Sequence, residues 1–324
     1  MEAIEIKVEN LRYQYGKSKA VNGISFRVKK GEIFSFLGPN GAGKTTTINV
    51  LTTLLPIQKG KISISGFDLR TQPDEIRKSI GIVFQSETLD WNLTVEETLE
   101  FHGRLYAIPK KTRKDRINEL IQIVKLEDKR KEFVKNLSGG MKRKLEIARG
   151  LLTRPKVLFL DEPTIGLDPN SRMRIWNYIK RVNKEGVTIF LTTHYMDEAD
   201  QLSDTICIID RGKIIANGFS EVLKQSLGMD VIYLKTDENE KTFEIIKKMN
   251  EIKNLRKTPS ELMISVEDGP KTIPKLIDLI RIRDIEIKSV NLKKPTLDDV
   301  FIHYTGRRFI AEEQVKEKKY SVDI

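Results

Sequence analysis

One stretch of the chain has the residue types and spacing of a phosphate-binding loop. It runs Gly38, Pro39, Asn40, Gly41, Ala42, Gly43, Lys44, Thr45, Thr46. The pattern G-x-x-x-x-G-K-[ST] lets consecutive backbone N–H groups turn toward one anion, because glycine adopts conformations closed to other residues. We expect Lys44 to reach the β- and γ-phosphates of a nucleotide and the Thr45 hydroxyl to bind Mg²⁺.

The segments on either side of this loop are those that a phosphate loop requires. Residues 33–37 are an apolar run of strand length, and residues 45–54 have a helical pattern. A strand, a glycine-rich loop and a helix in this order favour a nucleotide site over a glycine turn without function. The helix N-terminus adds a partial positive charge that attracts phosphate.

A second group of chemically capable residues follows another apolar run. The strand predicted for residues 157–160 ends in two adjacent acids, Asp161 and Glu162. Parallel strands end at the ligand edge of a sheet, so both carboxylates are expected near the phosphate loop. We expect Asp161 to hold Mg²⁺, directly or through water, and Glu162 to position and polarise the attacking water. Paired acids are also common in plain turns, so this interpretation depends on the phosphate loop.

A third motif precedes a basic helix predicted for residues 140–152. It reads Leu137, Ser138, Gly139, Gly140, Met141. Ser138 is a favourable N-cap, which gives the motif a purely structural explanation. The functional interpretation is a second helix N-terminus that offers N–H groups to a phosphate already held by the first loop.

The composition describes a soluble, charge-rich globular protein. The 324 residues are 39% hydrophobic and 32% charged, and two domains are expected at this length. No apolar run approaches the roughly 20 residues of a membrane-spanning helix, and the first residues lack the layout of a signal peptide. The sequence has one cysteine, which excludes a disulfide framework or a cysteine metal cluster within one chain. This residue, Cys207, lies in an apolar run and is expected in a buried strand. These features predict a cytoplasmic protein.

Positive charge is concentrated in one part of the chain. The net charge is +11, and residues 110–144 contain 13 Lys and Arg against 5 Asp and Glu. Such a stretch can attract nucleic acid, anionic lipid or an acidic partner surface. It can equally be a solvated helical face.

The order of predicted elements indicates two domains. Up to residue 227, strands alternate with helices, which favours an α/β domain with a mainly parallel sheet. A helical subdomain is expected at about residues 90–152, where apolar residues such as Val95, Leu99, Phe101 and Leu105 fall at roughly helical spacing. Residues 228–306 have the order β-α-β-β-α-β of a small ferredoxin-like α+β domain. Residues 307–324 are a charged tail.

In their order and spacing, the three motifs resemble the ATP-binding subunit of an ABC transporter over about residues 4–225. The resemblance implies a P-loop NTPase fold of the ABC ATPase type. Further positions match this family. Tyr15 corresponds to the aromatic that stacks on adenine, and Gln85 to the glutamine that senses Mg²⁺ and water and couples to the membrane partner. Asp168 corresponds to the aspartate loop that crosses the dimer interface, and His194 to the switch histidine at the γ-phosphate.

The resemblance implies ATP hydrolysis with Mg²⁺, in a head-to-tail homodimer that holds each ATP between loop 38–45 of one copy and residues 138–140 of the other. The expected catalytic residues are Lys44, Gln85, Glu162 and His194. The expected metal ligands are Thr45, Gln85 and Asp161. The expected ATP-binding residues are Tyr15, Gly38 through Thr46, Gln85, Ser138, Gly139, Gly140, Asp161 and Asp168. Polytopic membrane subunits would meet the helical region 93–135 and the loop after Gln85, which implies a location on the inner face of the cell membrane.

Two departures from the commonest ABC pattern point to one branch of the family. Met141 stands where glutamine is usual, and Asp168 is preceded by Gly-Leu rather than Ser-Ala-Leu. Both variants resemble daunorubicin-resistance-type exporters of the ABC-2 branch, as does the segment 294–301. In isolation that segment is a helix capped by Thr296. The resemblance suggests that it packs the accessory domain against its own or the neighbouring ATPase domain. The transported substrate, whether drug, lipid or another molecule, stays open.

Two other functions compete with transport. The first is a soluble ABC-type ATPase acting on nucleic acid or ribosomes, which the charge of +11 favours weakly. Relatives of that kind carry long heptad insertions, a second ATPase copy or many cysteines, none of which this sequence contains. The second is a nucleotide-dependent regulator without hydrolysis, which the presence of Glu162 disfavours.

Overall fold

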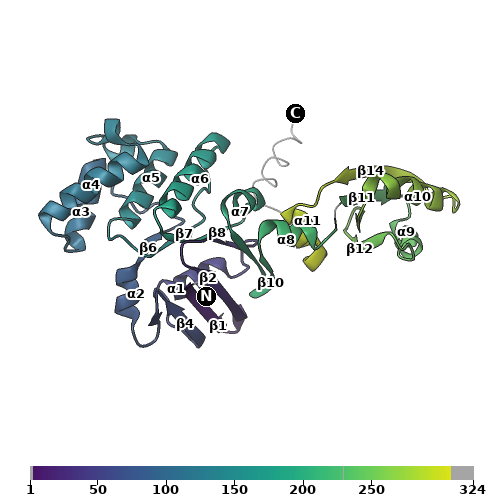
Figure 1. Cartoon of the computed structure of the whole chain (residues 1–324), viewed down its shortest axis with the longest axis horizontal. Helices are drawn as coiled ribbons and strands as arrows, with labels where there is room; N and C mark the ends of the chain where they lie inside the picture. Colours follow the sequence, from purple (N-terminus) through teal and green to yellow (C-terminus); the bar gives the residue numbers. More distant parts are fainter. Residues whose placement is uncertain (1–2, 229, 308–324) are drawn as a thin grey trace. The chain divides into compact units, whose positions relative to one another are not determined.

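The computed structural model describes residues 3–228 and 230–307 (Figure 1). The chain divides into two compact units, Met1–Ile214 and Ile215–Ile324. The predicted charged tail lies outside the described residues from position 308 onward.

Two sheets form the framework of the first unit. A four-stranded sheet has the order β2-β1-β4-β5, and a six-stranded sheet has the order β10-β9-β3-β8-β7-β6. Their strands are β1 (Ile4–Tyr15), β2 (Ser18–Lys29), β3 (Ile33–Leu37), β4 (Lys59–Ile64), β5 (Phe67–Asp68), β6 (Ile80–Val83), β7 (Val157–Asp161), β8 (Thr188–Thr193), β9 (Thr205–Asp210) and β10 (Lys213–Gly218).

Helices connect these strands. They are α1 (Lys44–Leu51), α2 (Pro73–Ser79), α3 (Val95–Leu105), α4 (Lys110–Val124), α5 (Gly139–Gly150), α6 (Pro169–Lys184) and α7 (Met196–Leu202), with the short 3₁₀ turns η1 (Glu127–Lys129) and η2 (Val134–Asn136). The predicted helical subdomain contains α3, α4 and α5. In Figure 1 it stands apart from the antiparallel strands β1, β2 and β4.

The central strands are parallel, as the sequence predicts. β3 pairs in parallel with β8 and β9, β7 pairs with β8, and β6 pairs with β7. Their carboxyl ends therefore meet at one edge of the sheet, where ligands bind in folds of this type. The N-terminal strands β1 and β2 have 12 residues each and pair antiparallel.

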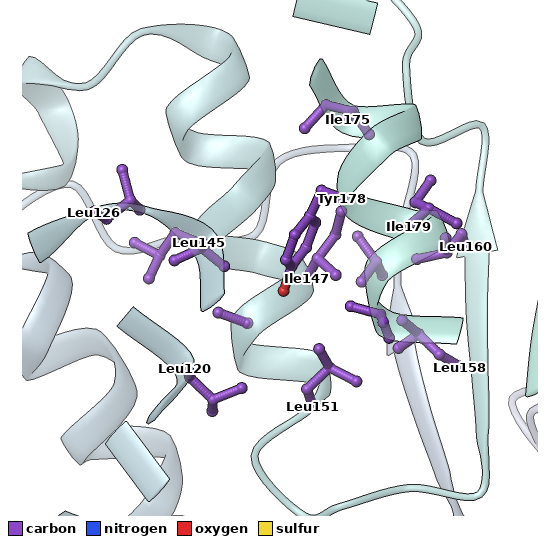
Figure 2. Close-up of a cluster of buried hydrophobic side chains, with 14 of the residues drawn as sticks. Leu120, Leu126, Leu145, Ile147, Leu151, Leu158, Leu160, Ile175, Tyr178 and Ile179 are labelled. Atoms are coloured by element: carbon purple, nitrogen blue, oxygen red, sulfur yellow. The ribbon is translucent and has the colours of Figure 1, made fainter. Parts of the chain in front are cut away.

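Alternation of side chains along the central strands separates two cores. One core contains Phe34, Phe36, Phe159 and Phe190 together with residues of the antiparallel sheet and α1. The other core contains Leu158 and Leu160 with residues of α4, α5 and α6, and Figure 2 shows this cluster around Tyr178. The central sheet is thus buried on both faces, which explains why its strands read as continuous apolar runs.

The helix predicted from the spacing of Val95, Leu99, Phe101 and Leu105 is confirmed as α3, but these four apolar residues are not all buried. Val95 and Leu99 are fully buried, whereas Phe101 is 55% and Leu105 68% exposed. These two residues fall on the side of α3 that α4 and α5 do not cover. An apolar surface is therefore present on the helical subdomain.

The second unit confirms the predicted ferredoxin-like arrangement. The four strands form an antiparallel sheet of order β12-β13-β11-β14, with two helices between them in the chain. Its elements are α8 (Ser220–Gln225), β11 (Asp230–Thr236), α9 (Asn239–Ile246), β12 (Ile252–Lys257), β13 (Leu262–Val266), α10 (Gly269–Arg281), β14 (Ile287–Lys293) and α11 (Leu297–Thr305). Apolar residues of α9 and α10 pack on one face of the sheet.

The segment 294–301 fastens α11 within the second unit. Thr296 caps α11 in a capping box with Asp299, as its sequence predicts. The buried Asp299 carboxylate also accepts a hydrogen bond from the Tyr233 hydroxyl of β11. Lys294 Nζ donates to Asp230 Oδ1 at 2.7 Å, and Asp230 also accepts from the Gly269 amide at 2.8 Å. This segment therefore joins α11 to β11 and, through Asp230, to the start of α10.

Candidate nucleotide site

The glycine loop lies between β3 and α1, with geometry that requires its glycines. A Cβ on Gly38 would lie 2.3 Å from the Ile209 carbonyl oxygen. Gly41 and Gly43 have φ values of 77° and 107°, in the region that side chains disfavour. Gly43 is also the N-cap of α1, so the loop ends at the amide groups of a helix N-terminus. This combination is suited to binding an anion.

Lys44 lies over the loop that precedes it. Its Nζ donates to the carbonyl oxygens of Gly38 at 2.8 Å and Pro39 at 3.2 Å, and it lies 3.2 Å from Glu162 Oε1. Burial lowers the pKa of Lys44, while the charge of Glu162 opposes this effect. A phosphate brought into the loop would therefore meet a cation that is already desolvated and oriented.

Glu162 is the centre of the site. Its Oε2 lies 2.9 Å from His194 Nδ1 and 3.4 Å from Gln85 Nε2, so one carboxylate contacts three of the predicted catalytic side chains once Lys44 is included. Burial alone would raise the pKa of Glu162, but the hydrogen bond with His194 and the charge of Lys44 together lower it. This carboxylate is therefore held ionised, as a group that orients and polarises water must be.

The backbone at Glu162 is strained. Its φ of 47° lies in the left-handed region, which is unfavourable for a residue with a Cβ. The Glu162 amide donates to the Thr192 carbonyl at 3.1 Å and to the Thr192 hydroxyl at the same distance. Neighbouring strand β8 thus fixes a turn that aims the carboxylate at Lys44 and His194.

Asp161 ends β7 beside this turn. The Thr192 hydroxyl donates to its Oδ1. Burial raises the pKa of Asp161, against the effect of the Thr192 hydrogen bond. Thr45, at the start of α1, is exposed, so its hydroxyl is accessible to a ligand. A carboxylate and a hydroxyl are oxygen donors of the kind that Mg²⁺ accepts.

Sequence reasoning missed the role of Arg143. This residue of α5 is buried and donates to the carbonyl oxygens of Pro163 at 2.8 Å, Phe84 at 2.6 Å and Asp161 at 3.0 Å. It therefore joins the signature helix to the ends of β6 and β7. In the sequence it stands between Lys142 and Lys144, and nothing in the pattern distinguishes it from these two neighbours.

The other predicted ATP-binding residues lie apart from this network. Ser138 caps α5 by accepting from the Met141 amide at 3.3 Å, and Ser138 and Gly139 are exposed. Asp168 is exposed and caps α6, and the hydrogen bonds from Ser171 lower its pKa. Among the described residues, no hydrogen bond or salt bridge links either cap to the glycine loop. The N-termini of α5 and α6 are thus exposed to solvent.

The adenine-stacking residue predicted at Tyr15 is also at the surface. Tyr15 ends β1, and its ring is 52% exposed. The Tyr13 ring supports it edge-on, with 5.1 Å between centroids. Tyr15 pairs with Ser18 at the turn of the β1–β2 hairpin. This ring has an open face for a base to stack on.

The basic stretch is only partly a surface. Arg113 is buried and bonds to Glu100 through two of its nitrogens, and Arg116 is buried against the Leu151 carbonyl. Arg143 is committed to the carbonyl oxygens described above. These three arginines hold the helical subdomain together and are not available to a polyanion, which reduces the cationic surface that the sequence suggested.

A groove of about 940 Å³ lies next to the site. Its apolar lining includes Leu54, Ile82, Phe84, Tyr106 and Ile108. Arg77, Lys78 and Arg149 add positive charge at its wall. Leu54 and Tyr106 are more than half exposed. The groove is thus an accessible, partly apolar surface of the first unit.

The segment after Gln85 connects this groove with α5. Thr88 lines the groove, and its amide donates to Glu146 at 3.0 Å while its hydroxyl accepts from Arg149 at 2.6 Å. Glu87 forms a salt bridge with Lys142 at 3.0 Å. Because Gln85 at the start of the segment contacts Glu162, the groove is linked through short contacts to both α5 and the Glu162 carboxylate.

Comparisons with known proteins agree with this geometry. Residues 21–165 match the ABC transporter family model, and residues 218–305 match the C-terminal domain of DrrA1-3-like ATP-binding proteins. The chain is 37% identical to the daunorubicin resistance ATP-binding protein DrrA3 of Streptomyces coeruleorubidus, over 96% of this chain and 98% of that protein. It is 41% identical to the Nod factor export ATP-binding protein I of Ralstonia nicotianae, over 72% and 73% of the two chains.

The fold of the first unit is similar to solved ATP-binding cassettes. One is the cassette MJ0796, whose dimeric structure is a post-hydrolysis state bound to ADP and Pi. It aligns with a TM-score of 0.58 and 27% identity, over 66% of this chain and 98% of that one.

Proposed function

This chain belongs to the ATP-binding proteins of ABC transporters that carry a DrrA-like C-terminal domain, and we propose that it powers export through a separate membrane subunit. It is an ATPase of this family. The observation that carries the proposal is the single network of Lys44, Glu162, His194 and Gln85 at the carboxyl ends of β3, β7, β8 and β6.

In this proposal each member of the network has one role. Lys44 and the loop amides hold the β- and γ-phosphates, which places the γ-phosphate next to Glu162. Glu162 orients and polarises the attacking water, for which its lowered pKa keeps it ionised. His194 fixes the carboxylate from one side and contacts the γ-phosphate, and Gln85 approaches the same oxygen from the other side. Tyr15 stacks on adenine.

We infer that Mg²⁺ accompanies ATP at Thr45, Asp161 and Gln85. The donor set fits, because these side chains offer a hydroxyl, a carboxylate and an amide oxygen. When bound, the ion neutralises charge that develops on the phosphate oxygens. The Thr192 hydroxyl occupies only one Asp161 oxygen, so the other can face the ion or its water.

A second copy of the chain completes the site in this proposal. Ser138, Gly139 and Gly140 form the exposed N-terminus of α5. Among the described residues, they make no hydrogen bond to the glycine loop of their own chain. Asp168 is exposed as well. Such groups are suited to meet an ATP held by another copy. The dimeric state of MJ0796 supports this arrangement.

The membrane subunit docks on the groove beside Gln85. Support comes from its apolar lining, from the exposed Phe101 and Leu105 on α3, and from the contacts that lead from Thr88 to α5 and from Gln85 to Glu162. None of the helices in the described ranges is long and apolar enough to cross a bilayer. The chain would therefore lie at the inner face of the cell membrane, and ATP-driven closure of the dimer would switch its partner between two access states.

The cargo follows only as a class. The similar proteins are named for resistance to daunorubicin and for export of Nod factor. We propose an amphipathic small molecule, such as a drug or a lipid-like compound, that the membrane subunit conducts.

The test is isolation of the chain from its native membranes in mild detergent, comparing the wild type with Tyr106→Asp in the groove. Ile282→Asp is the control, because Ile282 is also a large, exposed hydrophobic residue, 79% exposed and remote in sequence from the groove. A polytopic membrane protein should accompany the wild type and the control and be lost from Tyr106→Asp. Recovery of ribosomes or nucleic acid without any membrane protein would overturn the proposal in favour of the competing soluble ATPase.

A further inference from the structure

Helix α6 and the segment after His194 are joined by Arg172. Its Nη2 lies 3.0 Å from both carboxylate oxygens of Asp197, and its guanidinium lies 4.0 Å from the centroid of the Tyr195 ring. A planar guanidinium held by an ion pair and stacked on a ring has little freedom to move. Arg172 therefore fixes the position of Tyr195 relative to α6.

The Tyr195 ring in turn contacts the catalytic histidine. The ring centroids of His194 and Tyr195 are 4.1 Å apart. On its other side, His194 Nδ1 lies 2.9 Å from Glu162 Oε2. An unbroken series of contacts thus runs from Arg172 through Tyr195 and His194 to Glu162.

A buried carboxyl group also connects α6 with α7, the helix that follows His194 and Tyr195. Glu198 of α7 is 0% exposed, and its Oε1 accepts from Thr164 Oγ1 at 2.7 Å and from Trp176 Nε1 at 2.8 Å. Thr164 follows Glu162 by two residues, and Trp176 lies on α6. α7 is therefore held by hydrogen bonds against both the turn after Glu162 and α6.

We propose that Arg172 and Tyr195 are positioning residues that hold the His194 imidazole against Glu162 and make its alignment depend on α6. The inference rests on the proposed function, which makes His194 and Glu162 catalytic. Because Asp168 caps α6 at the proposed dimer interface, a shift of α6 on dimer closure would reach His194 through Arg172. Hydrolysis would then be linked to closure by side chains of this chain alone.

The first test measures ATP turnover of Arg172→Gln. The contacts of Arg172 lead to Asp197, Trp176 and Tyr195. KM for ATP should therefore stay within about twofold, while kcat falls about 3- to 30-fold through misplacement of His194. Arg172→Lys should not restore kcat, because an ammonium keeps the charge near Asp197 but cannot stack as a plane. Lys180→Gln, which removes an exposed cation from the same helix, is the control. A rise in KM with kcat unchanged would contradict the proposal.

A double-mutant cycle tests whether Arg172 acts through Tyr195. In a Tyr195→Leu background, Arg172→Gln should lower kcat by less than about twofold, since the stacked ring is already absent. Independent, multiplying losses from the two substitutions would overturn the proposed series of contacts.

A spectroscopic test needs no activity. The chain has three histidines, His102, His194 and His303, so imidazole resonances in a histidine-labelled sample can be assigned by single replacements. Arg172→Gln should shift the His194 resonance, which lies against the Tyr195 ring, and leave the other two unchanged. An unchanged His194 signal would refute the positioning role.

These variants and measurements also distinguish failure of this inference from failure of the proposed function. If His194→Ala hydrolyses ATP at the wild-type rate, the catalytic role of His194 fails. The His194 resonance in Arg172→Gln would still decide whether Arg172 positions the ring.

Discussion

The first unit holds two regions that the sequence assigns to the same ATP, and they differ in how they are built. At the carboxyl ends of the parallel strands, Lys44, Glu162 and His194 are buried and bonded to one another. At the start of α5 and α6, Ser138 and Asp168 are exposed and only cap their own helices. One region is assembled within the chain and the other is offered to something outside it.

This difference teaches that chemistry and control are separated in the protein. The assembled region contains a carboxylate held ionised between a lysine and a histidine, whereas the helix N-terminus proposed for the other side of the ATP makes no hydrogen bond to it among the described residues. An ATP bound to one chain alone would keep water on that side, which weakens the electrostatic interactions that favour the transition state. Under the proposed head-to-tail arrangement, dimerisation is the step that completes the site.

The largest effect should come from the centre of the assembled region. Glu162→Gln keeps the shape of the side chain but removes its charge and replaces one accepting oxygen with an NH₂ group, so we expect turnover to fall about 10²- to 10⁴-fold. ATP affinity should persist and an ATP-bound dimer should accumulate in size-exclusion chromatography. Hydrolysis at the wild-type rate would mean that another base operates and that this region is not the catalytic one.

Loss of the loop cation should act on binding instead. Lys44→Ala removes a charge-assisted contact to the phosphates, worth about 10- to 100-fold in affinity. It also leaves Glu162 without its partner at 3.2 Å. Titration with a fluorescent ATP analogue measures the change. Undiminished affinity would show that the glycine loop is not the nucleotide site.

A substitution in the exposed region should spare binding and prevent assembly. Gly139→Asp places a negative charge where a phosphate of the second copy is expected, so ATP affinity of the single chain should change less than about twofold while ATP-driven dimerisation falls at least about tenfold. Gly139→Ala is the matched control, because its Cβ would meet Leu167 at 3.4 Å, an ordinary contact.

The two regions can then be combined in one mixture. With Glu162→Gln in both chains, a Lys44→Ala chain and a Gly139→Asp chain should form a mixed dimer that traps one ATP, since one pairing of intact regions remains. If the mixture traps no more ATP than the two chains do separately, the head-to-tail arrangement is contradicted.

The smallest effect on ATP should come from a change outside both regions. Asp299→Ala removes the capping box of α11 and the acceptor for the Tyr233 hydroxyl, which should lower the stability of the second unit by about 1–3 kcal/mol. ATP affinity should stay unchanged. Thermal unfolding and ATP titration of the same sample measure both, and a large loss of affinity would show that the ATP site depends on α11.

Some of the fold and site was predictable because it depends on short stretches. The glycine loop between strand 33–37 and its helix, and the acids at the end of β7, follow from local pattern and from the rule that parallel strands end at one edge. The alternation of segments after residue 227 gave the ferredoxin-like order. Each of these signals lies within a few residues, where periodicity and turn chemistry operate.

Other features were hidden because they join distant parts of the chain. Arg143 reads as one cation in a basic run, yet it binds three carbonyl oxygens from β6, β7 and the turn after them. Phe101 and Leu105 fall at the same helical spacing as the buried Val95 and Leu99, yet both are more than half exposed. A pattern within one helix predicts on which face of the helix a side chain lies. It does not predict which other part of the chain packs against that face.

The sequence by itself determined the chemistry of this protein: a phosphate loop, a carboxylate pair and a histidine, each at the end of a strand. Only the tertiary structure decided which of these groups touch. It placed Glu162 in a left-handed turn against Lys44 and His194, and it stacked Arg172 on Tyr195 behind that histidine. The physical reason is that residue types and local backbone preferences are encoded over a few positions. Contacts between strands and helices far apart in sequence arise only when the cores between them pack.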